Sequence, residues 1–363
     1  MRARVLEHLQ RLVAFDTRNP PRRMDTAGIF GYLAAHMPRD ARVDVKDLGD
    51  GCVYLHARRG ETAELVNVHV DTVPAAPGWT RDPHALHVAG TRVVGLGACD
   101  IKGAAAAMVA MLPQVEGPFA LLFSSDEEAG DSRCVRTFLR EHPVPQRVFV
   151  AEPTRCRAVT AHRGLATASG TFRGVPGHAS AARALRDSAL HELTRWAARA
   201  LEWAELQEGQ GAEELRGARF NLGFVEGGSK PNMIAGEARV RFGVRPPPGR
   251  APASVVDEVC ALAPDPARVQ WERGFVAPPL PARGDASRAV KVARELGLPG
   301  PDGVDFWTEA ALFSEAGADA VVFGPGDIAQ AHTADEWVEI DQLMEAARMY
   351  GRILGAGIEP ERS

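Results

Sequence analysis

The chain has 363 residues, and at about 100–200 residues per domain this length predicts two or three domains rather than one. Its 36 Gly and 26 Pro lie below the roughly 25–30% of the chain typical of low-complexity sequences, which excludes disorder for most of it. The net charge is −5 and the sequence has no run of basic residues, so nucleic-acid binding is not expected.

The first segment of the chain predicts an amphipathic helix. Val5, Leu9, Leu12 and Val13 recur at helical spacing, and the pattern stops before Pro20. The segment has neither the uninterrupted apolar core nor the small-residue cleavage site of a signal peptide, so we expect a cytoplasmic protein. The longest strongly apolar stretch, residues 103–112, is about half of the ~20 residues that cross a bilayer, and no membrane span is expected.

Short apolar segments along the chain are each followed by residues that can bind a metal ion. Strand-like runs at 64–70, 119–123, 147–151 and 318–323, and the segment 92–97 before a helical stretch at 101–112, all show this pattern. In open α/β sheets, ligands bind outside the carboxyl ends of the strands, so we expect these polar residues to gather in space. The candidate ligands are His69, Asp100, Glu128, Glu152 and His332.

These five residues are of the oxygen and nitrogen types that zinc, cobalt or manganese accept. Asp71 follows His69 by two positions, which places both side chains on one face of a strand, where one can bind a metal and the other can support it. Taken singly, each feature has a simpler interpretation: His69 as a structural histidine, and Glu127 with Glu128 as the first turn of a helix. The joint pattern favours a metal site.

Charge counting favours two metal ions. Three carboxylates and two neutral histidines carry a total charge of −3. One dication would leave a charge of −1, whereas two dications and one hydroxide would bring the total to zero. Without cations, the clustered carboxylates would raise one another's pKa. We therefore expect two metals about 3.5–4 Å apart.

Five motifs are spread in order over nearly the whole chain: His69 to Pro74, Gly95 to Gly103, Ser125 to Glu128, Ala151 to Thr154, and Ala331-His332. Together they resemble the co-catalytic metallopeptidase family of acetylornithine deacetylase, succinyl-diaminopimelate desuccinylase and carboxypeptidase G. The resemblance implies one ion on His69 and Glu152, a second on Glu128 and His332, and Asp100 bridging both. It also implies Asp71 as the residue that orients His69, Glu127 as the general base, and zinc or cobalt as the metal.

The same resemblance implies a smaller lid and dimerisation domain inserted into the catalytic one. The fold expected is a mixed-sheet α/β catalytic domain, residues 1–163 and 276–363, with a ferredoxin-like α+β insertion at 164–275. The residue pattern of the insertion by itself predicts the order strand, helix, strand, strand, helix, strand. Its edge strand and long helix offer a surface for a homodimer. The elements predicted there are strands at 165–173, 219–225, 237–244 and 268–275, and helices at 181–204 and 251–263.

Four residues of the insertion are candidates for contacts with substrate. His178 resembles the family's lid histidine, which reaches the partner subunit's site and stabilises the oxyanion, and Asn232 resembles a substrate-facing asparagine. Arg245 resembles the arginine that binds the substrate carboxylate, because a planar guanidinium can donate two parallel hydrogen bonds. Lys230 is a candidate specificity residue that would repel an ammonium group on the substrate. His178, Lys230 and Arg245 could instead lie in a loop or at the surface without such a role.

Segments 15–21, 99–103 and 305–307 most resemble the N-acetyl-L-citrulline deacetylases of the xanthomonad arginine pathway. This implies a small N-acetyl amino acid as substrate, with N-acetyl-L-ornithine as the alternative and a dipeptidase or aminopeptidase activity as a less favoured one. A non-catalytic relative and a thiol hydrolase using Cys99 are further alternatives. The five cysteines are scattered without a C-x-x-C pair, so we expect buried free thiols.

Overall fold

The computed structural model describes residues 1–130, 132–210, 215–283 and 285–355. The chain divides into unit 1, residues 1–160, 285–302 and 308–363, and unit 2, residues 161–284 and 303–307. Unit 2 extends beyond the predicted insertion because His162 and Leu280 exchange two backbone hydrogen bonds and Arg163 Nε donates to Asp305 at 2.5 Å. The end of the predicted catalytic domain, 356–363, lies outside the described residues.

The large sheet has the strand order β1-β2-β6-β3-β7-β16-β8-β15. β6, β3, β7 and β16 pair in parallel, whereas β1, β2 and β8 pair antiparallel with their neighbours, which confirms the predicted mixed-sheet α/β class. Parallel strands of this kind are buried on both faces and therefore read as apolar runs. The strands are β1 (Arg42–Asp47), β2 (Val53–Arg59), β3 (Glu64–His69), β6 (Phe119–Ser124), β7 (Arg147–Val150), β8 (Val159–His162), β15 (Asp302–Val304) and β16 (Asp319–Val322).

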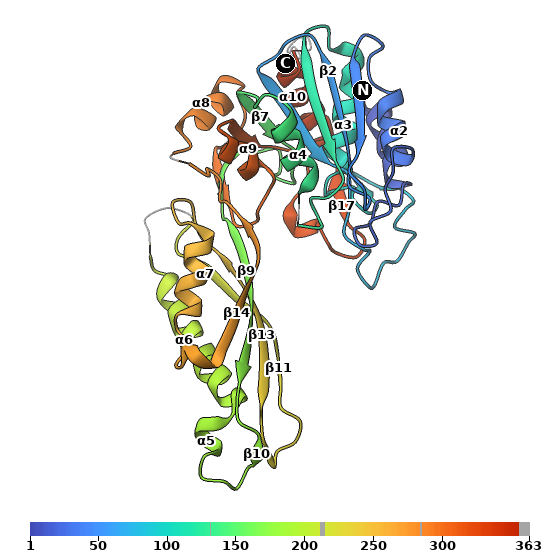
Figure 1. The fold of residues 1–363 in the computed structure, drawn as a ribbon. Helices are drawn as coiled ribbons and strands as arrows, with labels where there is room; N and C mark the ends of the chain where they lie inside the picture. The colour runs from blue at the N-terminus through green and yellow to red at the C-terminus, as the bar shows by residue number, and fades with distance from the viewer. Residues whose placement is uncertain (131, 211–214, 284, 356–363) are drawn as a thin grey trace. The chain divides into compact units, whose positions relative to one another are not determined.

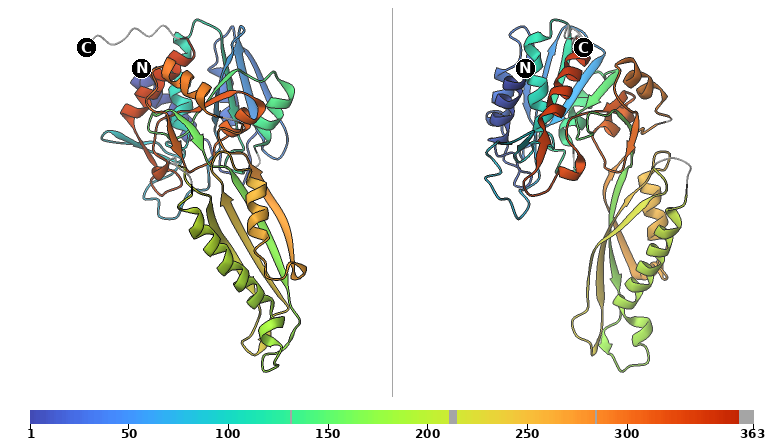
Figure 2. Two further views of the ribbon diagram at one scale, coloured as in Figure 1. Left: turned by 90° about the vertical axis from the view of Figure 1, so that its left-hand side faces the viewer. Right: turned by 180° about the vertical axis from the view of Figure 1, so that it is seen from behind.

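Helices cover both faces of this sheet (Figures 1 and 2). The predicted first helix is confirmed as α1, and Val5, Leu9, Leu12 and Val13 are all fully buried in a core shared with α3 and α10. α4 packs on α9, which contacts β7 and β16. No helix within the described residues is long and apolar enough to cross a membrane. The helices are α1 (Arg2–Val13), α2 (Gly28–Ala35), α3 (Lys102–Met111), α4 (Arg133–Glu141), α8 (Ser287–Glu295), α9 (Ala310–Ala316) and α10 (Ile340–Ile353).

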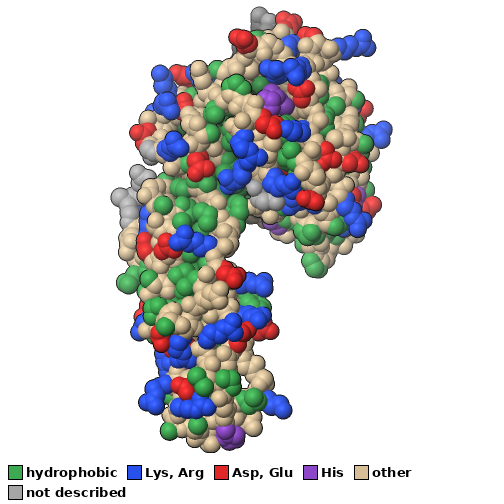
Figure 3. All heavy atoms as spheres, in the orientation of Figure 1, with side chains coloured by type: hydrophobic (Ala, Val, Ile, Leu, Met, Phe, Trp, Pro, Cys, Tyr) green, Lys and Arg blue, Asp and Glu red, His purple; other side chains and the backbone are tan. Residues whose placement is uncertain are grey.

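Unit 1 also contains a small antiparallel sheet of order β17-β5-β4. β17 is Trp337–Glu339, β5 is Arg92–Val94 and β4 is His87–Ala89. It joins the segment after His332 to the segment before Asp100, although these are far apart in the sequence. On the face drawn in Figure 3, acidic and basic side chains of unit 1 are interspersed.

Unit 2 is an antiparallel sheet of order β11-β13-β9-β14 with helices on one face. Phe172, Trp196, Phe242 and Val256 belong to its core. The helix predicted at 181–204 is instead divided at Ser188, because Asp187 O accepts from Val175 N and Ala189 N donates to Ala235 O. The elements are β9 (Leu165–Arg173), β10 (Gly177–His178), α5 (Ala184–Asp187), α6 (Ala189–Gln207), β11 (Arg219–Gly227), β12 (Met233–Ile234), β13 (Glu237–Arg245), α7 (Pro252–Cys260) and β14 (Val269–Ala277).

Candidate metal centre

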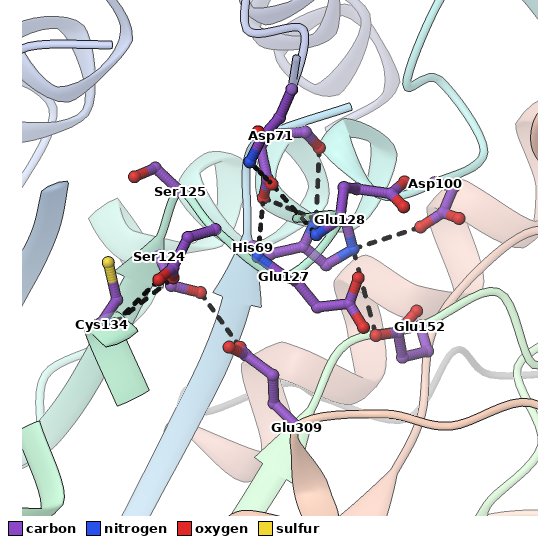
Figure 4. A network of polar contacts seen from close by, with 12 residues as sticks. His69, Asp71, Asp100, Ser124, Ser125, Glu127, Glu128, Cys134, Glu152 and Glu309 are labelled. Carbon is purple, nitrogen blue, oxygen red and sulfur yellow. Dashed lines mark hydrogen bonds and ion pairs between the residues drawn. The ribbon is translucent and has the colours of Figure 1, made fainter. Parts of the chain in front are cut away.

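The carboxyl ends of three adjacent parallel strands bring the predicted ligands of unit 1 together. β3 ends at His69, and the turns that follow β6 and β7 carry Glu128 and Glu152. Asp100 precedes α3, and His332 lies in the loop between β16 and β17. Figure 4 shows the acidic side chains of this region gathered around His69.

Two groups of ligand atoms form, and Asp100 belongs to both. His69, Asp100 and Glu152 make one group, and Asp100, Glu128 and His332 make the other, with the atoms of each group within 4.8 Å of one another. His69 Nε2 lies 3.2 Å from Asp100 Oδ1, whereas His332 Nε2 lies 3.4 Å from Asp100 Oδ2. Asp100 therefore offers one oxygen to each group, which is the arrangement of a bridging carboxylate.

The donor chemistry of both groups fits a divalent cation. Each group holds one imidazole nitrogen and two carboxylate oxygens, which zinc and similar ions accept. Asp100 Oδ1 and Glu152 Oε1 are buried and accept no hydrogen bond from the described residues. Buried polar atoms are normally paired, so a cation bound between the two groups would suit these two oxygens.

Protons take the place of cations when none is bound. Burial raises the pKa of Glu152 well above its ordinary value, and it raises the pKa of Glu128 as well. Hydrogen bonds to Asp100 and Glu128 raise the pKa of His332 to about 10. Burial opposes protonation of His69, but Asp100 and Asp71 overcome it and raise the pKa of His69 well above 6.5. Metal binding must therefore displace protons.

Asp71 contacts His69 and also the turn that carries Glu127 and Glu128. Its Oδ1 lies 3.3 Å from His69 Nδ1, so the carboxylate faces the ring nitrogen opposite the one that faces Asp100. It also accepts from the backbone N–H groups of Glu127 and Glu128 and from Asn19 Nδ2. Asp71 thereby fixes one ligand's ring and the turn that carries another ligand.

Glu127 lies beside the two ligand groups without belonging to either. Figure 4 shows its carboxyl group next to that of Glu152. Burial raises the pKa of Glu127 well above its ordinary value, and the negative charges of Glu152 and Glu128 raise it further. A carboxyl group that holds a proton readily, next to a metal site, can act as a general base. Glu127 and Glu128 lie in a turn rather than in the first turn of a helix, since α4 begins only at Arg133.

Sequence reasoning missed three buried polar residues around the site. Glu309 Oε2 accepts from Asn67 Nδ2 at 2.9 Å and from Ser124 Oγ at 3.1 Å, and burial raises its pKa to about 7. Asn19 donates to Asp71, and Glu336 accepts from three backbone amides near Asp100. None of the three follows a predicted strand, and this absence explains why the strand-end argument did not find them.

Three predicted residues of unit 2 meet at one end of its sheet. His178 pairs with Met233 across β10 and β12, and Ala179 N donates to Asn232 O at 3.0 Å. Lys230 lies in the same turn, where its carbonyl oxygen accepts from Met233 N at 3.1 Å. His178, Lys230 and Asn232 are all exposed. Figure 1 shows β10 at the end of unit 2 where these residues lie.

Arg245 lies at the opposite end of the same sheet. It is the last residue of β13, which begins at Glu237 near β12, and eight steps along a strand span about 26 Å. Arg245 helps to line a hollow of about 890 Å³ that also includes Arg219, Arg241 and Asn221. Phe242 and Val244 point into the core, so Arg241 and Arg245 alternate with them onto the other face of the sheet. The structure does not bring Arg245 together with His178 in one chain.

The cysteines form no disulfide within the described residues. Four of them are buried as predicted, whereas Cys260 is only partly buried. Burial raises the pKa of the Cys99 thiol far above its ordinary range, and its Sγ donates to Asp327 O at 3.3 Å. Because the thiolate is the nucleophilic form, this environment argues against a thiol hydrolase.

Comparison with known proteins gives matches along nearly the whole chain. The model of peptidase family M20/M25/M40 matches residues 65–356. The chain is 48% identical to N-acetyl-L-citrulline deacetylase of Xanthomonas campestris pv. campestris, covering 97% of this chain and 98% of that protein. It is 31% identical to acetylornithine deacetylase of Myxococcus xanthus, covering 81% and 80%. Aminopeptidase PepT from Bacillus cereus shares the fold, with a TM-score of 0.75, 17% identity and 98% of each chain covered.

Proposed function

Because the chain belongs to peptidase family M20/M25/M40, we propose that it is a metal-dependent deacetylase that hydrolyses N-acetyl-L-citrulline to L-citrulline and acetate in arginine biosynthesis. The observation that carries this proposal is the pair of ligand groups sharing Asp100, with Glu127 beside them. The 48% identity to an N-acetyl-L-citrulline deacetylase over 97% of the chain supports the choice of substrate. N-acetyl-L-ornithine is the alternative substrate, supported by the Myxococcus xanthus relative.

His69, Glu152, Glu128, His332 and Asp100 would hold two divalent ions, which we propose to be zinc or cobalt. Such ions polarise a carbonyl group and lower the pKa of a bound water to about 7. Glu127 takes the proton of the attacking water and then donates it to the leaving nitrogen, and its position beside the two ligand groups suits both transfers. Asp71 keeps His69 and the turn of Glu127 in place during both steps.

The residues of unit 2 would bind the substrate. Arg245 would donate two parallel hydrogen bonds to the α-carboxylate, and Asn232 would contact the polar groups of the substrate. Lys230 would repel the ammonium group of acetylornithine and tolerate the neutral ureido group of acetylcitrulline. His178 would donate a hydrogen bond to the oxyanion, an interaction of a type worth about 2.7–4 kcal/mol.

The spacing of these residues supports a homodimer. About 26 Å of strand separates Arg245 from the end of the sheet that carries His178 and Asn232, which exceeds the length of one acetylated amino acid. If both ends contact one substrate molecule, they must come from two chains. We therefore propose that His178 acts on the site of the partner subunit.

The function is tested with chelator-treated protein titrated with zinc or cobalt and assayed on acetylcitrulline, acetylornithine and a panel of dipeptides. We expect activity to return up to two ions per chain, with acetylcitrulline as the preferred substrate. Full activity without metal would overturn the proposal, and a preference for dipeptides would favour a peptidase.

The shared site is tested by mixing two inactive variants, Glu127→Gln and His178→Ala. In a mixed dimer, the chain that keeps Glu127 receives His178 from its partner, so one of the two sites is complete. We expect the mixture to regain activity after subunit exchange, with each variant alone as the control. No gain after verified exchange would show that His178 acts within its own chain or not at all.

A further inference from the structure

Glu336 is a buried acid close to the metal centre but outside both ligand groups. Only 2% of the residue is exposed. Its Oε2 accepts from Gly97 N at 3.0 Å, and its Oε1 accepts from Cys99 N at 2.8 Å and Asp100 N at 2.9 Å. One carboxyl group therefore holds three backbone amides of the turn that ends in Asp100.

The backbone around Glu336 joins two ligand-bearing loops. Gly95 N donates to Glu336 O at 3.0 Å, and the ladder continues with Trp337 opposite Val94. His332 lies four positions before Glu336 in the same loop. The Glu336 side chain thus spans from the loop that supplies His332 to the turn that supplies Asp100, whose Oδ2 lies 3.4 Å from His332 Nε2.

The turn that Glu336 holds is tightly packed, so its backbone can adopt few other conformations. Gly97 has a φ of +78°, and a Cβ there would lie 2.7 Å from Thr72 Cγ2 and 3.0 Å from Lys102 Cδ. A buried amide without an acceptor is unfavourable, and a carboxylate offers acceptor sites on both oxygens. A glutamine offers only one acceptor oxygen, and its NH₂ group would face at least one of the three N–H groups.

We propose that Glu336 is a positioning residue, which fixes the Asp100 carboxyl group between the two ligand groups by holding the backbone amides of its turn. Its carboxyl oxygens accept from backbone amides, so it acts through the position of Asp100. This inference rests on the metal centre of the proposed function. Residues that orient metal ligands in this way typically change metal affinity or activity by about 10–100-fold when they are replaced.

The test compares Glu336→Gln and Glu336→Asp with the control Glu339→Gln. Glu339 is in the adjacent strand β17, where its carboxylate accepts from Arg92 Nε at 2.8 Å and no backbone amide of the Asp100 turn is involved. Metal-free protein is titrated with cobalt(II) in competition with a chromophoric chelator, and the visible spectrum of the bound cobalt is recorded. Thermal melting of each metal-free variant measures stability separately.

We expect the native protein and Glu339→Gln each to bind two cobalt ions per chain. The cobalt affinity and the visible spectrum of Glu339→Gln should equal those of the native protein. Glu336→Gln should bind cobalt about 10–100-fold more weakly with an altered spectrum. Glu336→Asp, which keeps the charge but is one methylene shorter, should lie between them. If Glu336→Gln does not fold without metal, Glu336→Asp alone decides.

Native affinity and spectrum in the Glu336 variants, even with a lower melting temperature, would reduce Glu336 to a structural role and overturn the inference. A native protein that binds no cobalt would instead overturn the proposed function. The two failures are therefore distinguishable.

Discussion

Replacing Glu127 with glutamine should separate the chemical step from metal binding. The Glu127 side chain is in neither ligand group, and only its backbone N–H is bonded to Asp71, at 3.3 Å. Glutamine keeps the size of the side chain and leaves this backbone contact and the neighbouring ligand Glu128 in place. Glu127→Gln should therefore bind two metal ions as the native protein does.

The expected loss is that of a general base. Removing such a group lowers kcat by about 10²–10⁴-fold, which is about 2.7–5.4 kcal/mol of transition-state stabilisation. KM should change little, because the substitution leaves Arg245 and the metal ligands unaltered. In the metal-free protein the melting temperature should rise, since glutamine replaces a carboxyl group that has to take up a proton in order to be buried there.

The assay measures kcat and KM for acetylcitrulline together with metal content, using Glu141→Gln as the control. Glu141 ends α4 and pairs with Lys46 at 2.5 Å, away from the ligand groups. A variant that keeps both metals and retains kcat within about tenfold of native would refute the role of Glu127 as base. A variant that loses metal together with activity would show that the side chain acts through metal binding instead.

Three further predictions concern metal removal, ligand orientation and specificity. In the metal-free protein, burial raises the pKa of Glu309 to about 7, so this carboxyl group keeps a proton in the folded state at pH values where the unfolded chain has released it. The melting temperature should therefore fall as pH rises from about 4.5 to 7, and a rise across this range would contradict the reasoning. Asp71→Asn should weaken zinc binding by about 10–100-fold in a chelator competition, and unchanged affinity would show that His69 needs no such partner. Lys230→Ser should raise kcat/KM for acetylornithine relative to acetylcitrulline, and an unchanged ratio ends the specificity argument.

The clustering of three candidate ligands was predictable because a simple rule of sheet geometry locates them. Strands buried on both faces are apolar throughout, so polar residues mark where such strands end. His69, Glu128 and Glu152 follow β3, β6 and β7 in this way, and the carboxyl ends of these adjacent parallel strands lie together. The helical spacing of α1 was equally informative, since its apolar stripe is its buried face.

Residues that act through backbone amides were not predictable. Glu336 lies in a polar loop where an acid is unremarkable in sequence, and its role depends on the path of a turn more than two hundred residues earlier. The break at Ser188 was missed for a similar reason. Its flanking residues continue a helical pattern, but backbone groups of Val175 and Ala235 take their hydrogen bonds.

The buried acidic groups of the candidate centre would favour bound cations. Burial and mutual repulsion raise the pKa of Glu127 and Glu152, and Asp100 and Glu128 hold a proton on His332. Asp71 faces the other ring nitrogen of His69 and so keeps the imidazole turned toward Asp100. Two dications can neutralise this charge where protons do so only in part, and each proton released favours metal binding as pH rises.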